Sequence, residues 1–590
     1  MLKTELRRAQ DEYIGRTLDC DLKKKPKKFW SYIKFKKQDQ VGVPPLNVNG
    51  SVKTDSASKA EILSTHFRQI LTQEDLSSIP SKGCSDTPPM DPVVFKSAGV
   101  EHLLKNLDSK KANGPDKLPT TLLKITALEI AEVVTFLFIQ SYDSGELPKD
   151  WRNAHVVPIF KKGAKHDPSN YRPASLTAVL CKLMEHVVYK DIMNHWEKYD
   201  ILFANQHGFR KNHLCETRLI LTVEDLARNI DNGDQMDMII LDISKAFDKV
   251  PHRRLLNKLE FYGIQGKTLK WIESWLTTRT QSVIVDGVCS SSVAVTSGVP
   301  QVTVLGPLLF LLFINDIQED LECSLRLFAD DALLYHKVSQ ERDTLALQRD
   351  LCKLGLWADK WQMVFNPSKC YQMTVHRTRS PVHKDYTLYN QSLNAVQQHP
   401  YLGVLLSHDL RWNHHVDKIV KKANSSLGFV KRNLYSCSER TKRAAYITLV
   451  RPHLEYASAV WDPYQHNQVD QIEAVQNRAA RFIKNNYEFT SSVSQMKHDL
   501  SLESLCERRK HHRLHIFHKA VNSNIALPVP NYYLHPTRLT RNSTSSSYIQ
   551  PMAHRDYYAQ SFFPKTIKQW NSISPQIREL DYLSFCSELH

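Results

Sequence analysis

The sequence predicts an α+β protein that ends in a helical region. Between about residues 93 and 406, short apolar runs of strand length alternate with segments whose apolar residues recur every three or four positions. From residue 407 to about 525 only the helical spacing remains. With 590 residues, of which 42% are apolar, the chain is long enough to build two to four domains.

Residues 1–92 are expected to form a basic helical extension followed by a linker. Lysines alternate with aromatic residues between positions 23 and 37. Because lysines can neutralise phosphates and aromatic rings can stack on unpaired bases, this segment is a candidate nucleic-acid surface. The alternative is an amphipathic helix whose aromatic side chains pack inward and whose lysines are solvated. The lysines are Lys23, Lys24, Lys25, Lys27, Lys28, Lys34, Lys36 and Lys37, and the aromatic residues are Phe29, Trp30, Tyr32 and Phe35. Residues 77–92 carry Ser, Gly, Asp and four prolines, which favours a linker.

Two of the apolar runs in residues 93–406 end in carboxylates. Asp242 follows the run 238–241, and Asp330 and Asp331 lie between the runs 325–328 and 332–335, where the tip of a hairpin is expected. A bare carboxylate beside a buried strand is costly, so these positions require a compensating cation. A pair of Mg²⁺ ions serves in-line phosphoryl transfer, and magnesium binds through few protein carboxylates together with substrate phosphates. We therefore expect a magnesium-dependent site for phosphate chemistry.

Several helices can be placed from periodicity. Residues 305–317 (LGPLLFLLFINDI) are apolar nearly all round, which predicts a buried helix, and Pro307 suits its first turn. Amphipathic helices are predicted over residues 418–434, 440–449 and 469–484. Residues 537–547 are rich in Ser and Thr and are expected to form a loop. These patterns divide the chain at residues 1–92, 93–406, 407–525 and 526–590.

The net charge of +16 and the pI near 9.1 favour a polyanionic partner, with nucleic acid ahead of an anionic membrane. The eleven cysteines include no C-x-x-C pair, which is typical of reduced thiols inside a cell. The charged start MLKTELRRAQDEY is unlike a secretory signal, and the longest apolar stretch, around residues 133–139, is too short to span a bilayer. We therefore expect an intracellular protein with no membrane partner.

The two carboxylate motifs, LDISKAFD at residues 241–248 and FADD at 328–331, resemble the active site of reverse transcriptases from non-LTR (LINE-type) retrotransposons. Further blocks follow in that family's order and extend the resemblance from about residue 110 to 406, with a weaker likeness in RPHLEYASAVW (451–461) and AVQNRAARFI (474–483). FADD alone is weak evidence, whereas nine blocks in order are strong evidence. The further blocks are KKANGPDKLP (110–119), VVPIFKKG (156–163), SNYRPASL (169–176), NQHGFRK (205–211), SGVPQVTVLGPLLF (297–310), WADKWQMVFNPSKC (357–370) and YLGVLL (401–406).

The resemblance implies a right-hand polymerase fold, with fingers from about residues 93–235 intermixed with the palm and a helical thumb after residue 406. It implies an RNA-directed DNA polymerase that adds deoxynucleoside triphosphates to a DNA primer on an RNA template with two Mg²⁺ ions, in a retrotransposon ribonucleoprotein of the nucleus and cytoplasm. An endonuclease usually precedes the polymerase in such elements, and we expect it to lie outside this chain. Two alternatives remain, namely an inactive protein of the same fold that binds RNA, and a cellular polymerase of related fold such as an intron maturase.

The family motifs assign Asp242, Asp330 and Asp331 as catalytic residues and metal ligands. Lys369, which follows FNPS, resembles a lysine that protonates the pyrophosphate leaving group. Phe247 matches a bulky aromatic residue that excludes the 2′-hydroxyl of a ribonucleotide, and ordinary core packing is the alternative.

Other positions resemble the family's substrate-binding residues. Lys161 or Lys162, together with Arg172, match basic positions that meet the triphosphate, and the sequence leaves open which lysine does so. Arg210 is expected on the surface that faces template or nucleotide, with a structural ion pair as the alternative. Gly298 and Gln301 resemble the loop beneath the template–nucleotide pair, where small residues let the backbone approach closely.

The loop after Gln301 departs from the family pattern of Gly-Ser. Val302 places a β-branched side chain where glycine is expected, and Thr303 retains a hydroxyl. We therefore expect impaired activity in this chain. In the preceding motif, Asp248 is predicted to be structural and to cap the segment that follows it.

Four histidines lie at helical spacing in a predicted helix near the C-terminus. Their helical spacing could place two of them on a zinc ion, but no thiol or acidic ligand accompanies them in the sequence. A basic helix face near nucleic acid is the favoured interpretation. The residues are His511, His512, His515 and His518.

Overall fold

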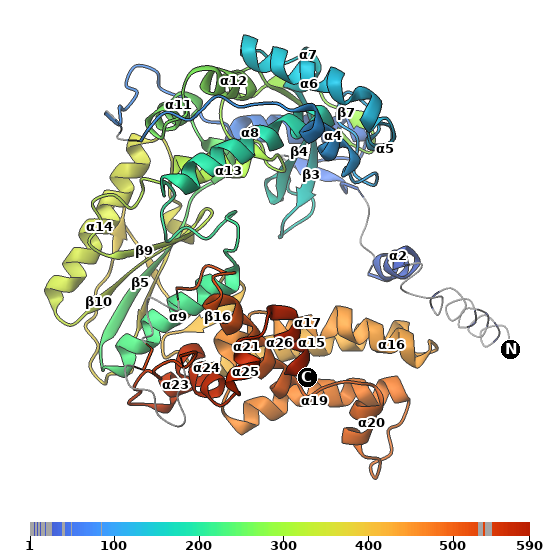
Figure 1. Cartoon of the computed structure of the whole chain (residues 1–590), viewed down its shortest axis with the longest axis vertical. Helices are drawn as coiled ribbons and strands as arrows, with labels where there is room; N and C mark the ends of the chain where they lie inside the picture. Colours follow the sequence, from blue (N-terminus) through green and yellow to red (C-terminus); the bar gives the residue numbers. More distant parts are fainter. Residues whose placement is uncertain are drawn as a thin grey trace.

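The computed structural model describes residues 26–37, 42–48, 50–83, 85, 87–528, 535–536 and 545–589, together with the single residues 5, 9, 12 and 18. The lysines at positions 23–25 and most of the predicted loop 537–547 lie outside this part of the chain. The fold is a mixed α+β arrangement, as predicted (Figure 1).

A five-stranded sheet, called the central sheet below, has the strand order β14–β11–β5–β10–β9. β10 is antiparallel to both β5 and β9, and β5 is also antiparallel to β11. The predicted hairpin is therefore confirmed as β9–β10. The strands are β5 (Gln235–Asp242), β9 (Ser324–Phe328), β10 (Asp331–Val338), β11 (Tyr371–Val375) and β14 (Asn394–Ala395).

Side chains of the central sheet alternate between two hydrophobic cores. Ala332 and Leu334 of β10 join the core that contains helix α14 (Glu341–Lys360). Leu333 and Tyr335 point the other way and join the core that contains α9 (Cys215–Asp231). Figure 1 shows α14 on one face of the sheet and α9 on the other. The strands are apolar on both faces because successive side chains of a strand point to opposite sides.

A second sheet belongs to the upper lobe, which comprises residues 43–200 and 252–317 and lies at the top of Figure 1. Its strand order is β4–β3–β6–β7, with β8 paired to β6. Its strands are β3 (Asn153–Phe160), β4 (Tyr171–Leu176), β6 (Thr280–Val285), β7 (Val288–Cys289) and β8 (Val293–Ala294). The helices of this lobe are α3 (Ser56–Ile70), α4 (Ser97–Lys105), α5 (Thr120–Ile125), α6 (Ala127–Ser144), α7 (Lys149–Arg152), α8 (Val179–Lys198), α11 (His252–Phe261), α12 (Gly266–Thr277) and α13 (Leu305–Phe313), with a 3₁₀ turn η1 at Pro168–Asn170.

The N-terminal region is packed into the upper lobe. Leu63 and Phe67 of α3 share a core with Val156 and Val283 of the second sheet. The prediction of a purely helical N-terminal region is wrong, because β1 (Leu46–Val48) and β2 (Ser51–Lys53) form an antiparallel hairpin. The Asn-Gly pair in the sequence between these strands is typical of a two-residue hairpin turn.

The segment 77–92 contains no helix or strand among its described residues, as expected for a linker. It is nevertheless fixed along α11, since Arg254 donates from Nη2 to the carbonyl oxygen of Ser78 (2.9 Å). Lys82 also reaches Asp316, with 3.1 Å between Nζ and Oδ2. The buried helix predicted at residues 305–317 is confirmed as α13, which ends earlier, at Phe313, and has Pro307 in its first turn.

The C-terminal helical region lies at the other end of the central sheet from the upper lobe (Figure 1). The three amphipathic helices predicted there are confirmed, and each extends beyond its predicted bounds or continues into a π-helix. The elements are α15 (Asn413–Asn433), α16 (Glu439–Ala445), the π-helix η3 (Tyr446–Val450), α17 (Pro452–Glu455), α18 (Ser458–Trp461), α19 (His466–Lys484), α20 (Val493–Asp499), α21 (Leu505–Val521), α23 (Asp556–Ala559), α24 (Phe562–Asn571), α25 (Pro575–Arg578) and α26 (Tyr582–Glu588).

Short elements complete the fold. α2 (Pro26–Lys36) packs on the C-terminal helical region, α10 (Ala246–Lys249) follows β5, and η2 (Pro367–Lys369) precedes β11. The remaining strands are β12 (Thr387–Leu388), β13 (Gln391–Ser392), β15 (Gln398–Tyr401) and β16 (Val404–Ser407). None of the helices in the described ranges combines the length and apolarity that a bilayer crossing requires.

Candidate active site

The central sheet brings the predicted carboxylates together. Asp331, the first residue of β10, is the direct cross-strand partner of Asp242, the last residue of β5. Asp330 lies in the tight turn between β9 and β10, next to Ala329, whose φ of +54° closes that turn. Paired residues of an antiparallel ladder have Cβ atoms about 4.5–5.5 Å apart, so Asp242 and Asp331 lie side by side at one end of these two strands, with Asp330 next to them in the chain. This end of the strands is called the carboxylate edge below.

Partial removal from water raises the pKa values of Asp330 and Asp331, and the negative charge of Asp242 raises both further. The pKa of Asp331 reaches about 6, and after burial the negative charge of Asp330 raises it more than that of Asp242 does. The positive charges of Lys161 and Arg172 act in the opposite direction on both groups. Two carboxylates that repel each other in this way favour a shared cation.

Lys161 and Arg172 reach this edge from the second sheet. Arg172 is the cross-strand partner of Ile159 in the β3–β4 pair, and the backbone N–H of Lys161 donates to the carbonyl oxygen of Asn170 (2.8 Å). Burial lowers the pKa of Lys161, and Arg172 and Lys369 lower it further. The charge of Lys161 lowers the pKa of both Asp330 and Asp331. Which of Lys161 and Lys162 would meet a triphosphate stays a prediction.

Lys369 lies beside Asp242, with 3.9 Å between Nζ and Oδ2. The turn η2 holds it there, because the N–H of Asn366 donates to the carbonyl oxygen of Asp242 (2.9 Å). The N–H of Asp242 in turn donates to Sγ of the buried Cys370 (3.4 Å). Sequence reasoning missed Cys370, although its place directly after the FNPSK block was a usable signal.

Phe247 is half-buried and fixed by two other rings. It stacks on Phe310 of α13, with 4.4 Å between ring centroids and 20° between planes, and meets Phe209 edge-on at 5.9 Å. The ring therefore takes part in core packing and stays partly exposed. Its role in excluding a 2′-hydroxyl stays a prediction.

The loop 297–303 is bound to the segment after β5. Gly298 has a φ of +90°, and a Cβ there would lie 2.7 Å from the carbonyl oxygen of Asp248. Gln301 donates from Nε2 to Oδ1 of Asp248 (2.9 Å). The close contact that requires glycine at position 298 is thus with the backbone of Asp248. The side-chain amide of Gln301 is also bound to Asp248.

Asp248 does not cap the following segment as predicted, because its carboxylate accepts from Gln301. Burial raises the pKa of Asp248 to about 6, and the hydrogen bond from Gln301 only partly opposes this. An unfolded chain would return the group to its ordinary value of 3.8. The folded state therefore binds more protons between these two pH values, so this group lowers stability as pH rises through that window.

We expect Asp248→Asn to raise the free energy of unfolding by about 1–2 kcal/mol at pH 7.5 and to change it little at pH 4. The amide keeps an oxygen to accept from Gln301 and carries no charge to bury. Thermal unfolding at both pH values is the measurement. An equal shift at the two pH values would show that the cost of Asp248 is not one of ionisation.

Val302 has a φ of +69°, in the left-handed region that favours glycine, and 60% of its side chain is exposed. Among the described residues it is the one β-branched residue with a positive φ. The next residue, Thr303, is well accommodated, because Oγ1 donates to the carbonyl oxygen of Pro300 (2.7 Å) and accepts from the N–H of Gly306 (3.2 Å). The departure from the family pattern therefore places backbone strain at Val302 alone.

Arg210 makes contacts that differ from the prediction. Its Nη1 donates to the carbonyl oxygens of Phe203 (3.0 Å) and Gln206 (3.3 Å), which holds the loop before α9. Burial lowers the pKa of this guanidinium. The side chain therefore has a structural role, through backbone carbonyls rather than through the ion pair considered as the alternative.

The histidines of α21 face protein rather than a nucleic-acid surface. His512 Nε2 lies 3.0 Å from both carboxylate oxygens of Glu216, and the buried His518 lies 2.9 Å from the carbonyl oxygen of Leu580. His511 lies 3.0 Å from Oε1 of Glu503, and His515 contacts the ring of Tyr582. The favoured interpretation of a basic helix face near nucleic acid is wrong, because this face is used for packing.

Some aromatic residues of α2 pack inward, as in an amphipathic helix, and others are exposed, as a nucleic-acid surface would require. Phe29 and Ile33 are buried in the core of the C-terminal helical region, and Tyr32 donates from its hydroxyl to the carbonyl oxygen of Asn433 (3.1 Å). Trp30 and Phe35 are 41% and 75% exposed. They lie on the outer face of the helix, where the exposed lysines are Lys27, Lys28, Lys34 and Lys37.

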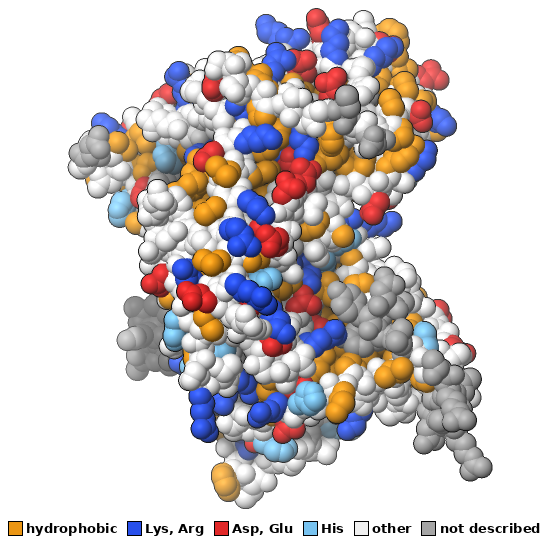
Figure 2. All heavy atoms as spheres, turned by 90° about the vertical axis from the view of Figure 1, so that its left-hand side faces the viewer, with side chains coloured by type: hydrophobic (Ala, Val, Ile, Leu, Met, Phe, Trp, Pro, Cys, Tyr) orange, Lys and Arg blue, Asp and Glu red, His pale blue; other side chains and the backbone are white. Residues whose placement is uncertain are grey.

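The side of the molecule that carries α14 has a different charge pattern. Figure 2 shows basic and acidic side chains interspersed over this side. Arg349 lies 3.3 Å from Glu322, and Lys353 lies 2.9 Å from Asp350. Because these charges are already paired, the outer face of α2 is the better candidate for contact with a polyanion.

The carboxylates fit a divalent cation whose remaining ligands come from a bound substrate. Within the described ranges, no three Asp, Glu, His or Cys side chains are grouped closely enough to hold an ion by themselves. Magnesium needs no such group, because it binds through one or two carboxylates plus phosphate oxygens and water. The mutual repulsion of Asp242, Asp330 and Asp331 is the feature of this edge that a cation would relieve.

Comparison with known proteins agrees with this geometry. Residues 159–406 match the family model described as reverse transcriptase (RNA-dependent DNA polymerase). The chain is 26% identical over 482 residues to the probable RNA-directed DNA polymerase from transposon BS of Drosophila melanogaster, covering 77% of this chain and 52% of that protein. It is 26% identical to the corresponding protein from transposon X-element over 80% of this chain and 53% of that one.

A third relative is the RNA-directed DNA polymerase from mobile element jockey of Drosophila melanogaster, which is 28% identical over 65% of this chain and 43% of its own length. The chain thus spans about half the length of the curated relatives it matches. Residues 159–406 include both carboxylate motifs, the β3–β4 cations and Lys369. The chain therefore contains a reverse transcriptase domain related to the RNA-directed DNA polymerases of the non-LTR retrotransposons jockey, X-element and BS.

Proposed function

We propose that this chain is the RNA-directed DNA polymerase of a non-LTR retrotransposon, which extends a DNA primer on an RNA template. The observation that carries the proposal is the meeting of Asp242 with Asp330 and Asp331 at one sheet edge, opposite Lys161 and Arg172. Carboxylates on one side and cations on the other suit a triphosphate between them.

The proposed reaction is attack of the primer 3′-hydroxyl on the α-phosphorus of a deoxynucleoside triphosphate, with release of pyrophosphate. Two Mg²⁺ ions held by the carboxylates and the triphosphate would stabilise charge on the attacking and leaving oxygens. Lys161 and Arg172 would bind the triphosphate, Arg172 through paired hydrogen bonds. Lys369 would donate a proton to the leaving pyrophosphate from its position beside Asp242.

In this proposal the upper lobe acts as fingers, the central sheet as palm and the C-terminal helical region as thumb. Support comes from the order of the elements and from the placement of these two regions at opposite ends of the sheet (Figure 1). The partners would be RNA template, DNA primer and deoxynucleoside triphosphates, in a ribonucleoprotein of the cytoplasm and nucleus.

The test is primer extension on an RNA template with Mg²⁺ and the four deoxynucleoside triphosphates, by the parent chain and by a Val302→Gly variant. Extension by either chain supports the proposal. A folded pair of proteins that bind primer–template and add no nucleotide would overturn it.

A second candidate is an inactive reverse-transcriptase fold that binds RNA. The strained backbone at Val302 favours it, because that residue lies in the loop beneath the expected template–nucleotide pair. The intact carboxylate edge favours the polymerase instead. Retention of RNA binding without extension in both chains of the preceding test would identify this second function.

Phe247→Ala is expected to relax sugar selection. The stacked contact with Phe310 holds the ring in one place, so its removal opens space where a 2′-hydroxyl would lie. The rate of ribonucleotide addition relative to deoxynucleotide addition should rise at least about tenfold in single-nucleotide extension assays. An unchanged ratio would leave the ring with its packing role only, and Phe209→Ala tests whether loss of neighbouring packing has the same effect.

Replacing Lys27, Lys28 and Lys34 with glutamine should flatten the dependence of RNA affinity on salt. Each phosphate that is no longer neutralised changes the slope of log affinity against log salt by about 0.7 for a single strand. Truncating residues 1–40 is a poorer test, because Phe29 and Ile33 belong to a core. The control is the double variant Arg349→Gln and Lys353→Gln, on the α14 face whose charges are already paired. If the α2 variant and this control show the same slope of log affinity against log salt, α2 is excluded from RNA binding.

A further inference from the structure

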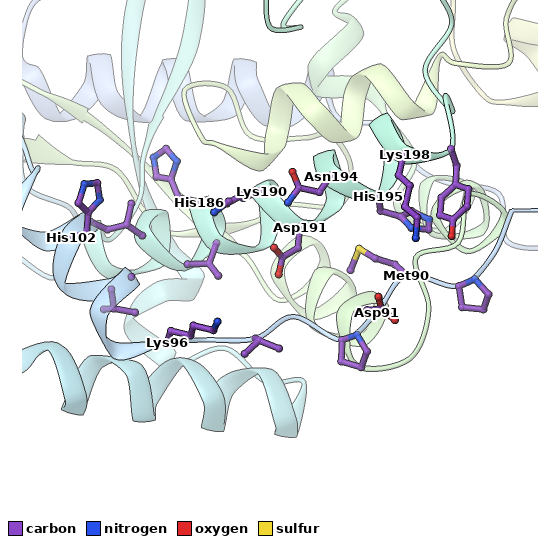
Figure 3. A pocket seen from close by; sticks show the side chains of 18 residues that line it. Met90, Asp91, Lys96, His102, His186, Lys190, Asp191, Asn194, His195 and Lys198 are labelled. Carbon is purple, nitrogen blue, oxygen red and sulfur yellow. The ribbon is translucent and has the colours of Figure 1, made fainter.

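A cavity of about 900 Å³ lies in the upper lobe between α8 and the segment that leads into α4. Figure 3 shows that side chains from both walls point into the same space, among them Lys96 and His102 from one wall and Lys190, Asp191 and Lys198 from the other. This volume is large enough for a nucleotide or a short stretch of a polymer. The carboxylate edge contributes no residue to the cavity.

The cavity carries cations that the protein itself leaves available. Among the described residues, no ion pair within 4 Å involves Lys96, Lys190 or Lys198. Its carboxylates are Asp91 and Asp191, and burial raises the pKa of Asp191 although Lys190 lies next to it. The cavity therefore has three lysines and two carboxyl groups, one of which is more readily protonated than usual. This balance of charge favours an anionic ligand.

The outer face of α8 presents its polar residues at regular intervals. His186, Lys190, Asn194 and Lys198 are each four positions apart, so they share one face with steps of about 6 Å along the axis. Steps of this size suit the repeating phosphates of an extended nucleic-acid strand. Met90, Val94 and Leu103 on the opposite wall provide apolar surface for bases.

The same helix begins close to the loop 297–303. The N–H of Ser175 donates to the carbonyl oxygen of Gln301 (3.2 Å). Ser175 lies three residues before Ala178, the N-cap residue of α8. Lys111 adds positive charge along the same path. Burial has the largest effect on the pKa values of Lys182 and His186, and the charge of Lys111 lowers both further. A strand leaving the loop along α8 would therefore pass these cations and reach the cavity.

We propose that this cavity binds unpaired RNA of the template strand ahead of the copied position. The inference rests on the proposed function, since it assumes that a template occupies the loop 297–303. The lysines would contact phosphates, and Asp191 and Asn194 would accept or donate hydrogen bonds to base edges or 2′-hydroxyls, as in recognition of single-stranded RNA.

The test compares binding of two primer–template duplexes, one with a single-nucleotide 5′ template overhang and one with a ten-nucleotide RNA overhang. The parent chain should bind the long overhang at least about tenfold more tightly. Lys190→Gln with Lys198→Gln should remove at least about fivefold of that gain and flatten its salt dependence by about 0.7 for each phosphate that is no longer neutralised. The affinity for the short overhang should stay the same.

A second variant blocks the cavity sterically without altering charge. Gly99 lines the cavity, has no positive φ, and a Cβ there would meet no atom within 4 Å, so Gly99→Trp can be built without backbone strain. Its neighbour Ala98 is exposed and does not line the cavity, so Ala98→Trp is the matched control in the same helical turn. We expect Gly99→Trp to lose the overhang gain and Ala98→Trp to keep it.

The outcomes separate this inference from the proposed function. A parent chain that extends primers but gains nothing from the overhang, or whose gain survives both cavity variants, overturns the inference alone. A free ten-nucleotide RNA that competes with the long overhang only in the parent shows that the cavity accepts RNA in trans as well. A folded parent chain that neither binds nor extends primer–template removes the proposed function together with its extension here.

Discussion

Asp242→Asn or Asp330→Asn is expected to abolish nucleotide addition while leaving RNA binding nearly intact. Asparagine keeps the shape of the side chain but removes the negative charge on which a divalent cation depends. Asp331 is paired with Asp242 across β5 and β10 and follows Asp330 in the chain. The loss of Asp242 or Asp330 therefore leaves too few carboxylates to hold the cations. We expect RNA affinity to depend instead on cations such as those proposed on α2, which these substitutions do not touch.

The measurement is single-turnover primer extension by these variants in the Val302→Gly chain, with RNA binding measured in parallel. We expect a decrease of at least about 10³-fold in rate, as for the loss of a group that stabilises transition-state charge. Asp234→Asn is the matched control, because Asp234 lies at the other end of β5 and pairs with Lys337 at 2.8 Å. Extension by either active-site variant near the rate of the Val302→Gly chain would contradict the metal assignment.

Val302→Gly is expected to raise extension at least about tenfold and to stabilise the fold. A φ of +69° costs a β-branched residue about 1–3 kcal/mol, and glycine adopts it freely. In the proposed complex with primer and template, a strained loop 297–303 would also misplace the reacting groups, and small misplacements can cost about 10²-fold in rate. Template affinity should change less than the rate.

Two control variants separate relief of strain from the gain in rate. Val302→Ala removes the branch but keeps Cβ, so its rate should fall between those of the parent and the glycine variant. Ser523 also has a positive φ of 55° and is exposed after α21, so Ser523→Gly should stabilise the chain without affecting extension. Robust extension by the parent, or no gain from glycine in a folded chain, would contradict the prediction.

The carboxylate edge illustrates what local pattern can predict. The apolar runs before Asp242 and around Asp330 and Asp331 predicted strands and a hairpin tip, and the β9–β10 hairpin has its tip at that place. The pairing of β10 with β5, which sets Asp331 opposite Asp242, joins distant segments and was not predicted. Strand periodicity and turn position are local properties. The approach of Arg172 is different, because its position depends on how the second sheet is oriented against the central one.

The interpretations that failed have a common physical reason. The histidines of α21 looked like a solvent-facing basic stripe, but His512 and His518 contact Glu216 and Leu580, which are far away in the sequence. Arg210 was expected to face template or nucleotide, which stays a prediction, and the structure adds that its Nη1 binds nearby backbone carbonyls. Partners of polar side chains are chosen by packing, so residue type and spacing alone cannot identify them.

The sequence by itself determined the α+β class, the helices, the strands that carry the three aspartates and the family, because each depends on periodicity or on an ordered set of local motifs. Only the tertiary structure set Asp331 opposite Asp242, exposed Trp30 while burying Phe29, and assigned strain to Val302. These outcomes depend on which surfaces meet and on the backbone angles that the surrounding fold imposes. A one-dimensional pattern carries neither kind of information.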